Sequence, residues 1–193
     1  AKPTSMMFGK VISSCVAGLI QITAIFGTAF VCYNINKQQW DDKGMIASSF
    51  NIPFSILIYM LVFFLLGFLI YAFLYGAVGS TASKLEDINT SVMPITMLFI
   101  IAFFVVVFSL TSGNVDNTLM KVCSYIPFTS PIAMFTRIAM STVPVYEIII
   151  SIAILIVTVI GTGILSAKIY RTGVLLYGTT PKISTIFKML KKS

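Results

Sequence analysis

Four long stretches of the chain contain no charged residue. They cover residues 11–36, 44–83, 88–115 and 148–167. A charge at mid-bilayer is costly, and about 20 apolar residues cross the hydrocarbon core as a helix. The pattern therefore predicts an all-α, polytopic transmembrane helical bundle with four spans, near residues 10–33, 54–78, 93–112 and 146–167. The second stretch holds one span, because residues 44–53 are polar and end in Pro53, which suits a helix start.

A fifth apolar piece, at residues 122–136, is too short to cross and is interrupted by Pro127 and Pro131. We expect a re-entrant outer segment over residues 122–143, in which the chain enters the membrane and turns back. Such backbone survives at membrane depth only where protein or a wet cavity covers its polar groups. A plain interfacial loop is the alternative.

Lysine and arginine are distributed unevenly between the two sides that this topology creates. Nine of the thirteen fall on the side that holds both ends of the chain. Cytoplasmic loops carry the excess of positive charge in membrane proteins. We therefore predict that both termini and the loop at residues 79–92 are cytoplasmic. The loops at residues 34–53 and 113–145 then face outward.

A cytoplasmic tail at residues 171–193 is predicted to follow a transmembrane region at residues 1–170. After Pro181, apolar residues recur at helical spacing from Ile183 to Leu190, with lysines around the rest of the wheel. This pattern predicts a short amphipathic helix on the anionic inner leaflet. Docking on a cytoplasmic partner is the alternative.

Composition supports a membrane protein and excludes several other classes. The 193 residues are 58% apolar and 10% charged, too few charges to cover the surface of a soluble domain. The chain has no histidine, and Cys15, Cys32 and Cys123 form no closely spaced pair. We therefore expect no metal site, no disulfide framework, no cofactor and no nucleic-acid partner. Gly173 and Gly178 have the spacing of a phosphate-binding loop, but the lysine that meets the phosphates is missing.

None of the six acidic residues lies in the middle of a predicted span, so the sequence lacks the signature of an intramembrane proton relay. Glu147 has the most distinctive position, just inside the outer end of the fourth span. A pair with Arg137 would pin the re-entrant segment to that span. We favour the simpler reading, in which Glu147 reaches water at the interface.

Two further groups are candidates for contacts. Ala72, Gly76 and Ser80 form a ladder of small residues that allows close helix packing, either within the chain or between two chains. In the loop that follows, the candidate cytoplasmic coupling contacts are Lys84, Glu86 and Asp87. A solvated turn is the alternative for that loop.

Three strings of residues carry a family resemblance. Residues 1–10 (AKPTSMMFGK) resemble the entry into a span in NatB-like permeases of the type-two ABC exporter family. Residues 125–131 (YIPFTSP), followed by Met134 and Arg137, look like the outer segment of that family. Residues 167–178 (AKIYRTGVLLYG) look like its ending. The strings occur in the family's order and at the right places relative to the spans.

The resemblance implies the C-terminal part of a permease, supplied either as a fragment or by a split gene. The family further implies a homo- or heterodimer in the plasma membrane that exports substrate with ATP hydrolysed by a separate cytoplasmic ATPase subunit, and no catalytic residue in this chain. The outer gate would then be formed by Pro127, Phe128, Ser130, Pro131, Arg137 and Glu147. The rival readings are a non-transport four-span membrane protein, such as an immunity or sensor-associated protein, and a channel.

Overall fold

The structure, a computed structural model, describes residues 3–40, 53–81 and 85–175. These residues form six α-helices: α1 (Pro3–Trp40), α3 (Phe54–Thr81), α4 (Leu85–Thr111), α5 (Thr118–Tyr125), α6 (Ser130–Met140) and α7 (Val145–Leu175). No strand occurs in the described ranges. The predicted all-α class is confirmed. The amphipathic helix expected after Pro181 lies outside the described residues.

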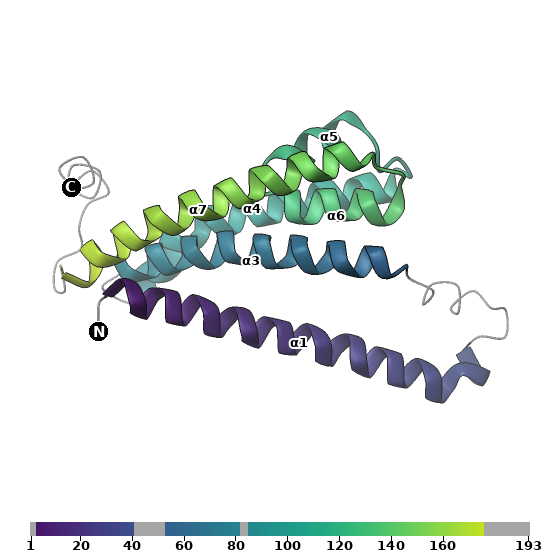
Figure 1. Ribbon diagram of the computed structural model, residues 1–193, viewed down its shortest axis with the longest axis horizontal. Coiled ribbons are helices and arrows are strands. Elements are labelled where there is room, and N and C mark those ends of the chain that lie inside the picture. The colour runs from purple at the N-terminus through teal and green to yellow at the C-terminus, as the bar shows by residue number, and fades with distance from the viewer. Residues whose placement is uncertain (1–2, 41–52, 82–84, 176–193) are drawn as a thin grey trace.

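Four of these helices are long and apolar enough to cross a membrane. The candidate spans are Thr4–Ile35 in α1, Ser55–Ser80 in α3, Ile88–Thr111 in α4 and Val145–Arg171 in α7. Each contains most or all of the range that the charge-free stretches predict, so the four-span architecture is confirmed. The four helices run lengthwise, and α1 begins at the end of the bundle where α7 finishes (Figure 1). We call this the amino-terminal end.

The helix α4 begins earlier than expected, and this corrects part of the predicted loop at residues 79–92. It runs from Leu85 through Pro94 to Thr111. An interior proline removes one backbone hydrogen bond, which membrane helices tolerate because nearby groups satisfy the freed backbone. The polar residues before Pro94 therefore extend the helix instead of forming a loop.

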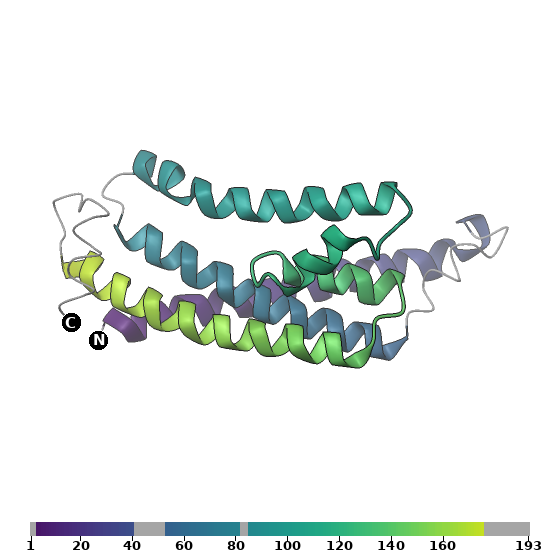
Figure 2. The same ribbon diagram turned by 90° about the horizontal axis from the view of Figure 1, so that it is seen from above.

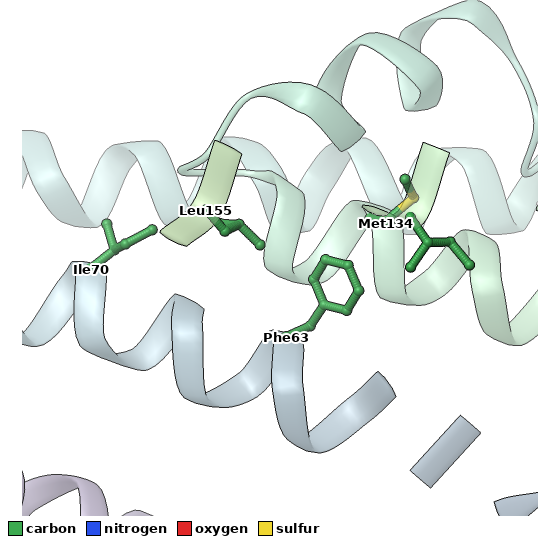
Figure 3. Close-up of a cluster of buried hydrophobic side chains, with 5 residues drawn as sticks. Phe63, Ile70, Met134 and Leu155 are labelled. Carbon is green, nitrogen blue, oxygen red and sulfur yellow. The ribbon is translucent and has the colours of Figure 1, made fainter. Parts of the chain in front are cut away.

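The main core lies between α3, α6 and α7. Phe63 and Ile70 of α3, Met134 of α6 and Leu155 of α7 are fully buried and belong to one cluster (Figure 3). Lipid tails are as apolar as these side chains, so close packing, more than the hydrophobic effect, holds such helices together. The core therefore depends on how well the three helices fit one another.

The segment that was expected to be re-entrant forms a pair of short helices, α5 and α6, which turn back beside the four long helices (Figure 2). Its entry into the membrane stays a prediction. We call residues 118–140 the hairpin. Pro131, in the first turn of α6, lies against Gly67 of α3. Gly67 is about 20 Å along α3 from Phe54, at 1.5 Å per residue. The tip of the hairpin therefore reaches well inside the length of the spans.

The first helix packs on the bundle mainly near its start. Met7 and Val11 are buried against Phe73 of α3 and Tyr170 of α7. Gly18 lies farther along, against two phenylalanines of α3. Beyond it, most large apolar side chains of α1 are exposed, and in Figure 1 the helix diverges from α3. The part of α1 beyond Gly18 therefore exposes apolar side chains that are suited to contact with lipid or with a partner chain.

Candidate functional site

Arg137 of α6 is 1% exposed and lies between two carboxylates. Its Nε donates to Oδ1 of Asp116, in the loop between α4 and α5, at 2.8 Å. Its Nη2 lies 2.9 Å from Oε2 of Glu147, in the first turn of α7. The Glu147 oxygen makes no aligned hydrogen bond, so Asp116 is the better hydrogen-bond partner and Glu147 supplies a second charge. Arg137 thus links the hairpin to the segments before and after it.

The charges of this cluster act on one another. Burial alone would lower the pKa of Arg137, but the adjacent carboxylates of Asp116 and Glu147 outweigh it and raise that pKa above its ordinary value. Burial raises the pKa of the Tyr125 hydroxyl on α5, and the charge of Glu147 raises it further. The guanidinium therefore stays charged while the neighbouring phenol stays neutral. A buried charge held this way resists displacement, because losing a partner would leave it uncompensated.

Hydroxyl groups fasten the tip of the hairpin to two spans. The hydroxyl of Ser151 on α7 donates to the carbonyl of Ser124 at 3.0 Å. It also lies 2.6 Å from the hydroxyl of Ser130, and because its own proton is already used, Ser130 is the donor in that bond. Tyr71 of α3 donates to the carbonyl of Phe128 at 2.7 Å. These bonds satisfy polar groups of the irregular turn, as the predicted position at membrane depth would require.

The start and the turn of the hairpin are fixed by local hydrogen bonds. Asn117 caps α5, since its Oδ1 accepts from the backbone N–H of Met120 at 2.7 Å. Its Nδ2 donates to the hydroxyl of Ser109 on α4 at 3.0 Å, which holds the cap against the preceding span. At the other end of α5, Thr129 donates to the carbonyl of Cys123 at 2.6 Å. The hairpin is therefore a defined fold of the chain.

Gly67 permits the closest approach between the hairpin and α3. A Cβ atom at this position would lie 2.6 Å from Cβ and 2.7 Å from Cγ of Pro131. No side chain larger than hydrogen fits there unless α6 moves. The ring of Pro131 therefore packs directly against the backbone of Gly67, and this contact fixes the position of α6 along α3.

A groove of about 910 Å³ lies between α1, α3, α4 and α6. Its walls are mostly aromatic and aliphatic. Pro131 and Phe135 of α6 line it on the hairpin side, while Lys10 of α1 and Tyr170 of α7 line it toward the amino-terminal end. The hairpin therefore forms part of the wall of this groove.

A comparison with known protein families identifies the family of this chain. A family model described as "ABC-2 family transporter protein" matches residues 1–168, which is most of the chain. The chain belongs to the ABC-2 transporter family. This makes it a multi-pass membrane protein and a permease-type membrane domain.

The relatives of this ABC-2 family chain extend beyond it. "Uncharacterized protein YhaP" from Bacillus subtilis (strain 168) is 30% identical over 193 residues, which are 99% of this chain and 45% of that protein. "Uncharacterized protein MJ1024" from Methanocaldococcus jannaschii is 28% identical over 190 residues, covering 97% of this chain and 43% of that protein. The chain thus spans less than half the length of these relatives. No solved structure matches it.

Of the six residues proposed as an outer gate, Arg137 and Glu147 form an ion pair, and the other four lie in the turn before α6 or in its first turn. Ser130, Pro131 and Arg137 lie in α6 and Glu147 opens α7, while Pro127 and Phe128 form the turn before α6. The sequence favours a Glu147 that reaches water, but in the structure Glu147 is 14% exposed and lies 2.9 Å from Arg137. Their role as a gate stays a prediction.

The other candidates are placed differently. Glu86 and Asp87 lie in the first turn of α4, and Lys84 lies outside the described residues. In the small-residue ladder, Ala72 packs beside the cluster around Phe73, and Ser80 donates to the carbonyl of Ala77. A Cβ at Gly76 would meet no atom within 4 Å. Gly76 therefore makes no close helix contact within the described chain.

Sequence reasoning missed Asp116, Gly67 and Ser151, all of which hold the hairpin. Asp116 lies in a loop, and its partner Arg137 is 21 residues away in the sequence. The one available signal was the occurrence of a single arginine inside an otherwise uncharged piece, since such a residue needs a carboxylate.

Proposed function

We propose that this chain is the C-terminal portion of a NatB-like permease of an ABC exporter. It moves substrate across the plasma membrane with ATP hydrolysed by a separate cytoplasmic ATPase subunit, and the permease acts as a homo- or heterodimer. The family match over residues 1–168 supports this proposal. The greater length of the relatives is consistent with further permease segments outside this sequence.

In this proposal the amino-terminal end of the bundle faces the cytoplasm and the base of the hairpin faces outward. Support comes from the exposed basic residues near that end, which include Lys10, Lys168 and Arg171. Positive charge collects on the cytoplasmic side of membrane proteins. The first turn of α4, with Glu86 and Asp87, then lies on the side where the ATPase binds.

The hairpin acts as the outer gate. The observation that carries this role is the bridging position of Arg137, which ties α6 both to Asp116 before the hairpin and to Glu147 after it. Displacing the hairpin requires breaking these pairs together with the hydrogen bond between Ser130 and Ser151. A gate requires two distinct arrangements, and in this proposal they are the hairpin attached by these contacts and the hairpin detached from them.

A disulfide between the hairpin and α7 tests the gate. The Ser130 and Ser151 hydroxyl oxygens are 2.6 Å apart, so the double variant S130C/S151C, made in a background without Cys15, Cys32 and Cys123, is suited to a disulfide. The complete permease, co-expressed with its ATPase, is purified and its ATP hydrolysis measured in lipid discs. We expect hydrolysis to fall on oxidation and to recover on reduction, while neither single-cysteine variant responds.

The same preparation tests the other parts of the proposal. If no ATPase subunit purifies with the complete permease, the transporter reading is wrong and a non-transport four-span protein becomes the better one. If the ATPase is present but hydrolysis is the same in the oxidised and reduced double variant, the hairpin is not a gate.

A further inference from the structure

The groove follows one face of α3 over much of its length. Its lining residues on this helix recur three and four positions apart from Met60 to Gly76, including Phe64, Phe68 and Tyr75. At 1.5 Å per residue this face is about 24 Å long, most of the roughly 30 Å of a bilayer's hydrocarbon core. The groove is therefore long, narrow and aligned with the lipid tails.

The two ends of the groove differ in chemistry. On the hairpin side its lining is apolar, with Pro131, Ile132 and Phe135 of α6. Toward the amino-terminal end it carries the ammonium group of Lys10 and the hydroxyl of Tyr170. The groove is thus charged at one end and mainly apolar along the rest, where the hydroxyls of Tyr71 and Tyr75 are bonded to Phe128 and Thr96.

Lys10 is the charged side chain at the amino-terminal end of the groove. It is exposed, lines the groove and lies inside the candidate span Thr4–Ile35. Among the side chains that the structure describes, no carboxylate pairs with it, and Asp116 and Glu147 are held by Arg137. An ionisable group at such a position is costly unless a counter-ion or the interface receives it.

The surroundings decide what kind of counter-ion can reach Lys10. The groove lining contains no acidic residue. In the proposed orientation the anionic headgroups of the cytoplasmic leaflet lie at this end of the bundle, at the level of Lys10. Phe99, at 44% exposed, and Tyr75, at 36%, leave the groove open toward the surrounding lipid.

We propose that the groove binds an anionic phospholipid, with the phosphate at Lys10 and one acyl chain along α3 between Phe64, Phe68 and Phe99. The site goes beyond the proposed transport function, since binding requires neither ATP nor the ATPase subunit. A lipid headgroup and free phosphate would both present a phosphate group to Lys10. Only the lipid would also place an acyl chain in the groove.

Two pairs of variants test the two halves of the site. For the charge, Lys10→Gln is compared with Lys121→Gln, an exposed lysine of α5 outside the groove. For the acyl chain, Gly76→Leu is compared with Gly161→Leu. A Cβ at either glycine meets nothing within 4 Å, but only Gly76 lines the groove. Neither leucine is therefore expected to disturb the fold, which circular dichroism checks.

The complete permease is purified in detergent with phosphatidylglycerol that carries a photoactivatable acyl chain. Retained lipid is counted by native mass spectrometry, and the labelled peptides are mapped. We expect labelling at Phe64, Phe68 or Phe99, and about tenfold weaker retention in Lys10→Gln, as for the loss of one charge-assisted hydrogen bond. Gly76→Leu should lose the label from the groove, while both control variants behave as the wild type does.

Two competitors separate the possible sources of binding. Phosphatidylcholine should be retained less than phosphatidylglycerol, and inorganic phosphate in molar excess should not displace the bound lipid. Equal retention of the two lipids, displacement by phosphate, or equal behaviour of a variant and its matched control would overturn the proposal. A missing ATPase subunit would leave these results unchanged, so the failure of the transport proposal is distinguishable.

Discussion

Replacing Arg137 by methionine removes the charge that holds the hairpin while keeping a long, unbranched side chain. The substitution leaves Glu147, 14% exposed, and Asp116, 41% exposed, without their cation. It also removes the 3.4 Å contact between Nη1 and the hydroxyl of Ser124. The variant therefore tests the contacts that tie the hairpin to its neighbours.

The size of the effect follows from the exposure of the two partners. Breaking a buried ion pair by removing one partner costs about 3–5 kcal/mol, whereas an exposed pair contributes about 0–1 kcal/mol. Glu147 belongs to the first class and Asp116 is closer to the second. We expect the free energy for detaching the hairpin to fall by about 3 kcal/mol, which is roughly a hundredfold in the opening equilibrium at 1.4 kcal/mol per tenfold change.

Hydrogen–deuterium exchange of the complete permease in lipid discs measures this equilibrium. Protection of the amides of α5 and α6 should fall by roughly a hundredfold, while that of the middle of α7 stays unchanged. Arg171→Met, at the exposed end of α7, is the matched control. In the double variant R137M/E147Q no buried carboxylate is left unpaired, so part of the lost protection should return.

Two results would refute the reasoning. If Arg137→Met and Arg171→Met leave the hairpin equally protected, Arg137 does not hold it. If R137M/E147Q exchanges as fast as R137M, the cost does not come from the uncompensated charge of Glu147.

Two further substitutions probe the same region. Gly67→Ala places a Cβ 2.6 Å from Pro131, so we expect about 1–3 kcal/mol of overpacking and faster exchange in α6. Gly79→Ala, whose Cβ meets nothing within 4 Å, should change little. Glu147→Gln removes the charge that raises the pKa of Tyr125, so that pKa should fall toward its usual range while staying above it because burial remains. An absorbance titration, with a variant lacking the Tyr125 hydroxyl as reference, measures the shift. An unchanged pKa in Glu147→Gln would contradict the electrostatic assignment.

The spans could be predicted because the rule that reveals them is local. A charge in the hydrocarbon core is costly wherever it falls, so an uninterrupted apolar run of sufficient length identifies a span without knowledge of its neighbours. The boundary at α4 could not be predicted in the same way. The charge-free stretch places the third span near residues 93–112, but the helix begins at Leu85 and continues through Pro94.

The hairpin was predictable only in outline. Pro127 and Pro131 showed that the segment could not cross, and Arg137 with Glu147 suggested one contact to the fourth span. The depth of the hairpin depends on Gly67, which no local pattern singles out among the glycines of the chain. Such contacts depend on the register between helices, and the apolar residues on all sides of α3 do not encode that register.

The helix α6 connects the two features on which the proposals rest. One part of it carries Arg137, which fixes the hairpin to Asp116 and Glu147. Another part carries Pro131 and Phe135, which line the groove. A rigid helix of 11 residues cannot move one part without the other. If the hairpin detaches as proposed, the wall of the groove changes, and a lipid bound along α3 then changes the detachment equilibrium by the same coupling, because such coupling is reciprocal.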